Sequence, residues 1–244
     1  MVALFTSLRR IRFAFPVIAV VCILLPNARA QKLDQGKLDA ATRRAGKATK
    51  VLSDLSGLPA GETIPRELIE RARAIAVFPD VDRVNMLVIK AMKGYGLISR
   101  RVPGGWSTPA FYGFAVSDKG WSLVKPGNAG IIMLIMNDDM LKQFEKDHIA
   151  LEGAPGPVGE LTAENEKKIR GAAIFIYALG DGKLRGIKVD NDSTTQSGIN
   201  SDNNVNKAIY GQKAREVMWS TTPVTVAVPP AITEFQNALT NLSK

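Results

Sequence analysis

The central part of the chain, residues 94–112, begins with residues that we interpret as a pleated strand, in which side chains two positions apart share a face. In its first half, Leu97 and Ser99 alternate with Ile98 and Arg100. A turn at residues 103–105 then divides the stretch, because its proline fixes φ and its two glycines tolerate positive φ. The pattern predicts a strand, a tight turn and a second strand.

Small and aromatic residues occupy special positions in this stretch. Gly94 and Gly96 lie two residues apart, so one face of the first strand is bare and another backbone, an aromatic ring or a ligand can come close. Trp106, Phe111 and Tyr112 carry large apolar area in the second part. These three side chains either line an apolar site or fill the core, and we expect the core.

A helical period covers residues 31–55. Apolar residues recur every three or four positions and form one stripe: Leu38, Ala41, Ala45, Ala48, Leu52 and Leu55. Lysines and arginines occupy the other faces. Two interpretations remain open, namely a basic amphipathic helix lying on an anionic membrane and a helix docked on the domain with its basic side in solvent. The many alanines favour close packing against a partner.

Apolar runs bounded by glycine, proline and asparagine predict the remaining elements. The expected strands are 74–78 (ended by Pro79), 84–89, 114–124 with a turn at 117–120, 129–136, 172–179 and 184–189. Helices are expected at 64–72, after the capping residue Asn137, at 214–219 and from Pro229 onward, whereas the polar segment 190–206 is expected to be an exposed loop. The sum is an α+β protein: a single compact domain with a curved, mainly antiparallel β-sheet flanked by N-terminal and C-terminal helices.

The first thirty residues have the pattern of a signal peptide that is cleaved on export. Several arginines precede an apolar run at 13–25, and Ala28 and Ala30 form a small-x-small cleavage site. The alternative is an N-terminal membrane anchor. The only cysteine, Cys22, lies within the apolar run, so residues 31–244 have no thiol for disulfides, zinc binding or catalysis. We therefore expect residues 1–30 to be removed and residues 31–244 to reach the periplasm, the cell envelope or the exterior.

Charge is distributed unevenly along the chain. The net charge is +9 for the whole chain and +5 without residues 1–30. Residues 31–125 carry a balance of +7 and residues 126–244 a balance of −2. A basic half is suited to lipid headgroups or nucleic acid, and export argues against nucleic acid. Ordinary solvated charge is the alternative explanation.

The sequence contains no convincing catalytic or metal-binding pattern. The single histidine, His148, has no serine or cysteine motif near it, and a structural role is expected. Asp138 and Asp139 follow the expected helix cap Asn137, so they suit the positive end of a helix dipole better than a calcium site. The glycine-rich segment 153–159 lacks the Gly-Lys-Ser/Thr of a phosphate loop. We expect no enzyme, no cofactor and no metal.

The central stretch resembles the signature of the SYLF domain family. Its residues here are Gly94, Gly96, Trp106, Ser107, Pro109, Phe111 and Tyr112. Further matches are Ile64-Pro65, residues 72–79, Met136-Asn137, residues 156–159, Tyr177, Asn206 and Tyr210-Gly211, so the resemblance covers about residues 36–242. Added cations at Lys90, Lys93, Lys119, Lys125, Lys183 and Arg185 depart from the family pattern, which is typical of a divergent member of the secreted bacterial type.

The resemblance implies a compact, β-rich domain that binds lipid, phosphoinositides above all, and that catalyses no reaction. Basic residues near the N-terminal helix are implicated, and the candidates here are Arg43, Arg44, Lys47, Lys50, Lys93, Arg100 and Arg101. The expected partner is an anionic lipid or membrane surface. Eukaryotic members also associate with actin, which an exported protein would not meet in its own cell. The alternative function is a structural or protein-interaction component of the cell envelope, with envelope proteins as partners.

Overall fold

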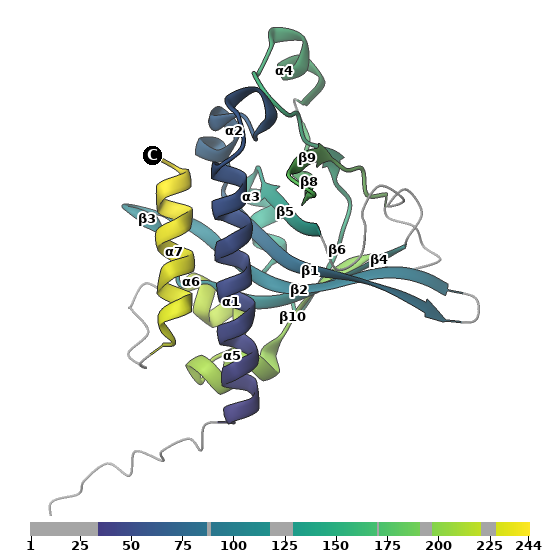
Figure 1. Cartoon of the computed structure of the whole chain (residues 1–244). Coiled ribbons are helices and arrows are strands. Elements are labelled where there is room, and N and C mark those ends of the chain that lie inside the picture. Colours follow the sequence, from purple (N-terminus) through teal and green to yellow (C-terminus); the bar gives the residue numbers. More distant parts are fainter. Residues whose placement is uncertain (1–33, 87–88, 118–128, 170, 191–196, 221–227) are drawn as a thin grey trace, which may run out of the picture. The chain divides into compact units, whose positions relative to one another are not determined.

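The computed structural model describes residues 34–86, 89–117, 129–169, 171–190, 197–220 and 228–244 (Figure 1). The predicted signal peptide and its cleavage after Ala30 lie outside these residues and stay predictions. The second half of the expected 114–124 hairpin lies outside them as well. Everything below concerns the compact unit formed by residues 32–244.

The described strands form one curled sheet whose pairs are antiparallel except for β7 with β8. Eight strands follow each other in the order β6-β10-β4-β2-β1-β5-β8-β7, while β3 pairs with β2 and β9 pairs with β8. Their bounds are β1 Ala74–Met86, β2 Ile89–Val102, β3 Gly105–Trp106, β4 Ala110–Ser117, β5 Ala129–Ile135, β6 His148–Ala150, β7 Ala154–Pro155, β8 Ile174–Gly180, β9 Lys183–Gly186 and β10 Gly198–Ser201. The predicted fold class, an α+β domain with a curved, mainly antiparallel sheet, is confirmed.

Helices from the two ends of this unit pack together against the sheet. The helix α1 (Gln35–Ser56) lies beside α7 (Pro230–Leu242), and α1 also contacts β1 and β2 (Figure 1). The other helices are η1 Ala60–Glu62, α2 Arg66–Arg71, α3 Asp138–Gln143, α4 Ala163–Ile169, α5 Asn203–Tyr210 and α6 Ala214–Trp219. Among the described helices, none combines the length and the apolar character that crossing a bilayer requires.

The packing of α1 decides between the two interpretations of its apolar stripe. The side chain of Asp34 caps the helix by accepting a hydrogen bond from the backbone N–H of Lys37. Ala41, Ala45 and Ala48 are fully buried, as are the leucines further along the stripe. Because alanine adds little side-chain bulk, the helix can approach the sheet and α7 closely. The helix is docked, and the interpretation in which this stripe enters a membrane is wrong.

Two predictions of local structure are corrected. Pro79 does not end β1, because the register against β2 shifts between Val77 and Asp80, and such a bulge tolerates a residue without an N–H. Within the expected loop 190–206 lie the strand β10 and the start of α5. Polar residues of this segment stabilise regular secondary structure. Asp202, for example, caps α5 by accepting a hydrogen bond from the N–H of Val205.

Three buried tyrosines predict an alkaline limit to stability. Burial raises the pKa of Tyr112, Tyr177 and Tyr210, and the carboxylate of Asp147 adds to the effect on Tyr112. An unfolded tyrosine ionises near pH 10. Above about pH 10 the unfolded chain therefore holds fewer protons than the folded chain, and the free energy of unfolding should fall as the pH rises. Tyrosinate absorbance from these three residues should appear together with unfolding in circular dichroism, and ionisation of all the tyrosines in the folded protein would contradict this.

Candidate functional site

The seven predicted cations fall into two groups, and three arginines are engaged inside the protein. Arg44 is largely buried, with its Nη1 3.0 Å from Oδ2 of Asp202. Its guanidinium also lies 5.0 Å from the ring centre of Tyr95 and 5.6 Å from that of Phe111. Arg44 therefore ties α1 to β2, β4 and the start of α5.

Arg100 and Arg101 join β2 to its neighbours in a similar way. Arg101 donates hydrogen bonds to the carbonyl oxygens of Ile69 (2.7 Å) and Ala72 (3.0 Å), and its guanidinium lies 4.2 Å from the ring centre of Trp106. Partial burial lowers the pKa of this guanidinium. Arg100 donates to the carbonyl oxygen of Met218. In this conformation both arginine side chains bond to groups within the protein. Contact of either with lipid stays a prediction.

Lys47 and Lys50 lie on the exposed side of α1 and form ion pairs in solvent. The Nζ of Lys47 is 2.8 Å from Oδ2 of Asp80, and the Nζ of Lys50 is 2.7 Å from Oδ2 of Asp54. The two lysine side chains remain 58% and 74% exposed. An exposed pair of this kind contributes only about 0–1 kcal/mol to stability. Both ammonium groups can therefore exchange a carboxylate for another anion at little cost.

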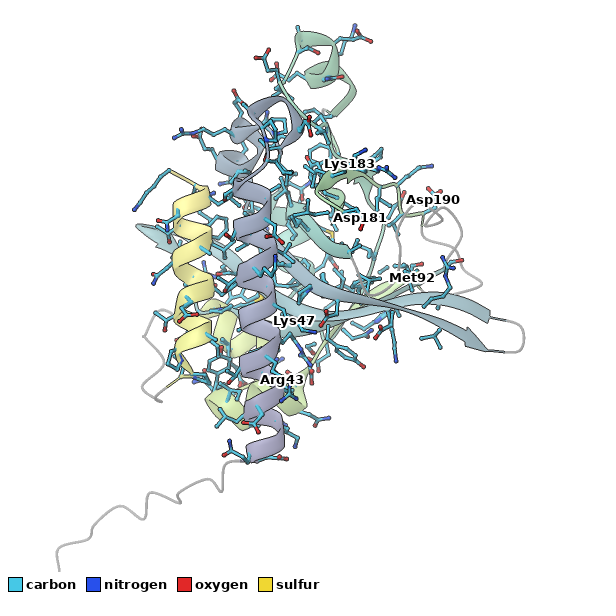
Figure 2. All side chains as sticks on the ribbon, in the orientation of Figure 1. Arg43, Lys47, Met92, Asp181, Lys183 and Asp190 are labelled. Carbon is cyan, nitrogen blue, oxygen red and sulfur yellow. The ribbon has the colours of Figure 1, made fainter. Side chains whose placement is uncertain are left out.

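Arg43 and Lys93 complete the exposed group. Both side chains are exposed, and neither forms an ion pair with another residue of the described chain. Arg43 and Lys47 lie on successive turns of α1 where β1 and β2 pass beside the helix (Figure 2). Asp80, the partner of Lys47, stands opposite Tyr95 in the β1–β2 register. We call Arg43, Lys47, Lys50, Lys93 and Tyr95 the cationic face.

Tyr95 is a member of this face that the sequence reasoning missed. Its side chain is 50% exposed, and it is the exposed large apolar side chain among the described residues. The signal was present, because alternation along a strand places Tyr95 on the face opposite Gly94 and Gly96. On the glycine face, a Cβ on Gly96 would overlap the backbone of Val77 and Phe78, so this close approach serves packing.

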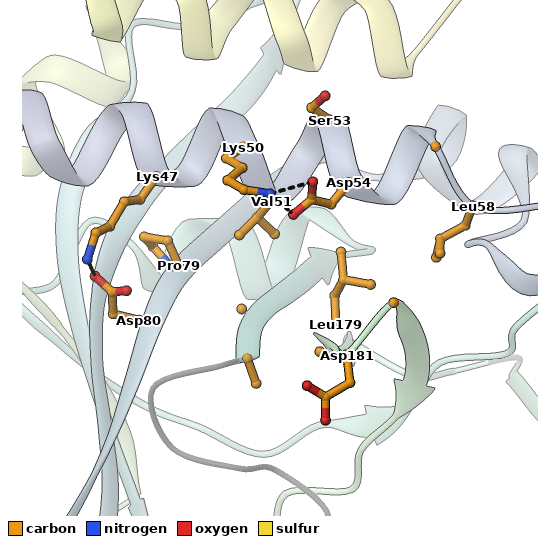
Figure 3. Close-up of a pocket in the computed structure, with 15 residues that line it drawn as sticks. Lys47, Lys50, Val51, Ser53, Asp54, Leu58, Pro79, Asp80, Leu179 and Asp181 are labelled. Atoms are coloured by element: carbon orange, nitrogen blue, oxygen red, sulfur yellow. Dashed lines mark hydrogen bonds and ion pairs between the residues drawn. The ribbon is translucent and has the colours of Figure 1, made fainter.

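A groove lies between α1 and the β8–β9 hairpin (Figure 3). Its volume is about 820 Å³. Leu179 points from β8 toward α1, while the pairs of Lys47 with Asp80 and Lys50 with Asp54 lie along the opposite wall (Figure 3). Further lining residues are Val51, Leu58, Pro79, Gly130 and Asp181. The groove mixes apolar area with both signs of charge, and three aspartates outnumber two lysines.

The predicted signature residues are mainly structural. Trp106, Phe111 and Tyr112 are buried in the core, as predicted. The indole N–H of Trp106 donates to Oγ of Ser243, and the carbonyl oxygen of Ser107 accepts from the hydroxyl of Ser99 at 2.6 Å. The first bond fastens β3 to the end of α7, and the second joins β2 to the residue that follows β3. The carbonyl oxygen of Pro109 accepts a hydrogen bond from the hydroxyl of Tyr210 at 2.8 Å.

The groups considered for catalysis or metal binding have structural partners. Nδ1 of His148 is 2.7 Å from Oδ1 of Asn200 on the neighbouring strand, and Asn137 caps α3 by accepting from the N–H of Met140. Within the described ranges, no group of three His, Cys, Asp or Glu side chains could hold a metal ion. The chemistry that the exposed residues offer is the binding of anions beside an exposed aromatic ring.

Comparison with protein-family models decides the relationship. The model of Ysc84, described as Las17-binding protein actin regulator, matches residues 128–242. These residues belong to the Ysc84/SYLF family. Neither the curated proteins nor the solved structures contain a match to this chain. The family resemblance is thereby confirmed for residues 128–242, while the signature at residues 94–112 lies before the match.

The matched part of the SYLF domain runs from the strand β5 to the helix α7. The cationic face lies on α1 and β2, before the matched residues. SYLF domains are in general binding domains without catalytic activity, and the family is associated with lipid and actin binding. Family membership thus indicates binding, while the partner of this chain must be argued from its own surface.

Proposed function

We propose that the protein is exported and that its SYLF domain binds anionic lipid at a membrane surface without catalysing a reaction. The observation that carries this proposal is the orientation of α1. Its apolar stripe is buried in the core, while Arg43, Lys47 and Lys50 are exposed on the other side. A membrane that met this side would meet cations first, so the proposed attraction is electrostatic and needs no insertion of the helix.

The energies favour such contact. Each lysine or arginine near an anionic leaflet contributes about 1 kcal/mol of binding free energy. Breaking the exposed pairs of Lys47 with Asp80 and Lys50 with Asp54 costs no more than about 1 kcal/mol each, and salt weakens both effects. Arg43 has no such pair to break within the described chain. The net effect of several cations on one face is binding that requires low or moderate ionic strength.

The experiment that tests this proposal removes three positive charges from α1. Residues 32–244 contain the whole described core and form their own compact unit, so they can be tested without the apolar leader. Arg43→Gln combined with Lys47→Gln and Lys50→Gln should weaken sedimentation with phosphatidylglycerol-containing vesicles about a hundredfold at low ionic strength, because three contributions of about 1 kcal/mol are lost.

The control removes three exposed lysines from other elements: Lys142→Gln in α3, Lys167→Gln in α4 and Lys183→Gln in β9. It changes the net charge equally and should leave vesicle binding nearly unchanged. Equal losses in the two triple variants would show that net charge alone acts and that α1 has no special part. Equal, weak binding of the unaltered protein to anionic and neutral vesicles would refute lipid binding itself.

The groove favours a second function, a protein-interaction role. It carries ammonium and carboxylate groups beside Val51, Leu58 and Leu179, as a peptide segment of mixed polarity would require. The description of the matched family names Las17 binding and actin regulation. An exported chain would not meet actin in its own cell, so an envelope protein is the corresponding partner. Retention of one protein at high salt with no lipid present would support this alternative.

A further inference from the structure

The outer face of the sheet beside α1 has a hollow of about 270 Å³ next to Tyr95. Its origin lies in the cross-strand register. Tyr95 and Lys93 of β2 stand opposite Gly113 and Ala115 of β4, and directly opposed residues share a face. Gly113 in turn stands opposite Asn200 of β10. Gly113 thus lies between larger side chains on both sides, while Ala115 lies between Lys93 and Gly198, and the surface is low over these small residues.

The groups that line this hollow suit a small anion. Lys93 supplies an exposed ammonium group that forms no ion pair within the described chain. Oδ1 of Asn200 bonds His148, so its NH₂ group is the part of this side chain that bonds no other described residue. The carboxylate of Asp202 is also present, but Oδ2 contacts Arg44 and Oδ1 accepts from the N–H of Val205. Its charge is therefore compensated from inside the protein.

Tyr95 forms the rim of the hollow and is the unusual feature of this surface. Half of its side chain is exposed, and Arg44 lies 5.0 Å from the ring centre. The ring lies against Gly113, where a Cβ would come within 3.1 Å of two ring atoms, and its exposed part offers apolar area to another molecule. Tyrosine concentrates at membrane interfaces, because its ring is apolar and its hydroxyl stays hydrated among the headgroups.

We propose that the hollow seats the phosphate-bearing headgroup of one anionic phospholipid, with Lys93 as its cation and the Tyr95 ring at the headgroup level of the bilayer. This inference rests on the proposed function and extends it from α1 to β2 and β4. It converts a diffuse attraction by α1 into docking in a defined orientation, in which the sheet face beside α1 meets the membrane. Charge complementarity selects the lipid, because the nearby Arg43 and Lys47 add to Lys93.

Salt separates the two contributions in a vesicle sedimentation assay with residues 32–244 and phosphatidylcholine vesicles that contain phosphatidylglycerol. Lys93→Gln should weaken binding about fivefold at low ionic strength and clearly less at moderate ionic strength of about 0.15 M, where the Debye length is about 8 Å. Tyr95→Ser should weaken binding about tenfold at both salt concentrations, because transfer of the ring from water is insensitive to screening. Tyr95→Trp should retain binding. Lys183→Gln, a lysine on β9, is the matched control and should bind like the unaltered protein.

A second charge change has the opposite sign. Asp82 stands opposite Lys93 in the β1–β2 register and is exposed. Its carboxylate weakens the attraction of the face for anions. Asp82→Asn should therefore strengthen vesicle binding about fivefold at low ionic strength. A loss of binding in this variant would contradict an anionic ligand at Lys93.

A label reports the contact directly. The only cysteine of the chain is Cys22, so Tyr95→Cys in residues 32–244 places a single thiol for an environment-sensitive fluorophore. Its emission should shift to the blue when these vesicles are added, and the same label at Lys183→Cys should not respond. If the unaltered protein binds but the label at position 95 stays in water and Lys93→Gln has no effect, this inference is overturned and the role of α1 stands. If the unaltered protein binds no vesicles, the proposed function itself has failed.

Discussion

Gly96→Ala is expected to prevent stable folding. A Cβ at this position would overlap the carbonyl oxygen of Val77 and would lie 2.7 Å from Cα of Phe78. Both obstacles are backbone atoms of β1, which is held between β2 and β5, so neither can move aside as a flexible side chain could. We expect a loss of more than about 4 kcal/mol in the free energy of unfolding, which is a large part of the stability of an ordinary domain.

Gly46→Ala is the matched control for this change. Gly46 lies in the interior of α1, and a Cβ there would meet nothing within 4 Å. The same substitution should therefore raise the free energy of unfolding by about 0.5–1 kcal/mol, because glycine in a helix costs that much relative to alanine. Urea unfolding followed by circular dichroism measures both variants. A Gly96→Ala protein as stable as the unaltered one would mean that β1 and β2 do not approach as described.

Asn206→Leu is expected to have the second largest effect. Asn206 is fully buried, its Oδ1 accepts from the N–H of Phe111 at 2.9 Å, and its Nδ2 donates to the carbonyl oxygen of Phe111 at 2.8 Å. β10 ends at Ser201, so the amide of Asn206 takes the place of a strand backbone beside the start of β4. Leucine would leave the N–H of Phe111 without this acceptor in the core. We expect a loss of about 3 kcal/mol in the free energy of unfolding.

Asn241→Leu provides the comparison for this variant. Asn241 is an exposed residue of α7, and the same change there should alter the free energy of unfolding by no more than about 0.5 kcal/mol. Thermal unfolding of the two variants under the same conditions gives the difference. Similar melting temperatures for Asn206→Leu and Asn241→Leu would show that the backbone of Phe111 finds another partner.

The two stability predictions also bear on the proposed binding face. Asn206 positions α5, whose capping residue Asp202 holds Arg44, and Arg44 lies over Tyr95. Gly96 sets the distance between β2 and β1, which carry Lys93 and Asp80. The aromatic ring and the cations therefore stand on a rigid sheet, and a membrane contact at this place would be preorganised. Variants at Lys93 or Tyr95 change the surface while leaving these supports in place.

Local pattern alone was enough to predict much of this protein. The period of residues 31–55 marked α1 and its buried stripe, and the apolar run 129–136 marked the fully buried strand β5. The capping residue Asn137 and the paired glycines of β2 were also recognisable. Such features depend on neighbours within a few residues, which is the range over which helix period, strand alternation and turn chemistry act. The family signature could be read for the same reason, since its motifs are short.

The tertiary structure decided which charged side chains are exposed and which polar segments form strands or helices. The sequence does not distinguish the three arginines Arg44, Arg100 and Arg101 from the exposed lysines of α1. In the structure, however, these arginines bond to partners 29 to 158 residues away. The bulge at Pro79 and the strand β10 likewise exist because a neighbouring strand offers the right register. Tyr95 is half exposed, and its cross-strand neighbour Gly113 has no side chain to cover it. Sequence patterning determined most of the elements, whereas contacts between distant segments determined the others and decided which side chains face outward, because burial depends on what packs against each residue.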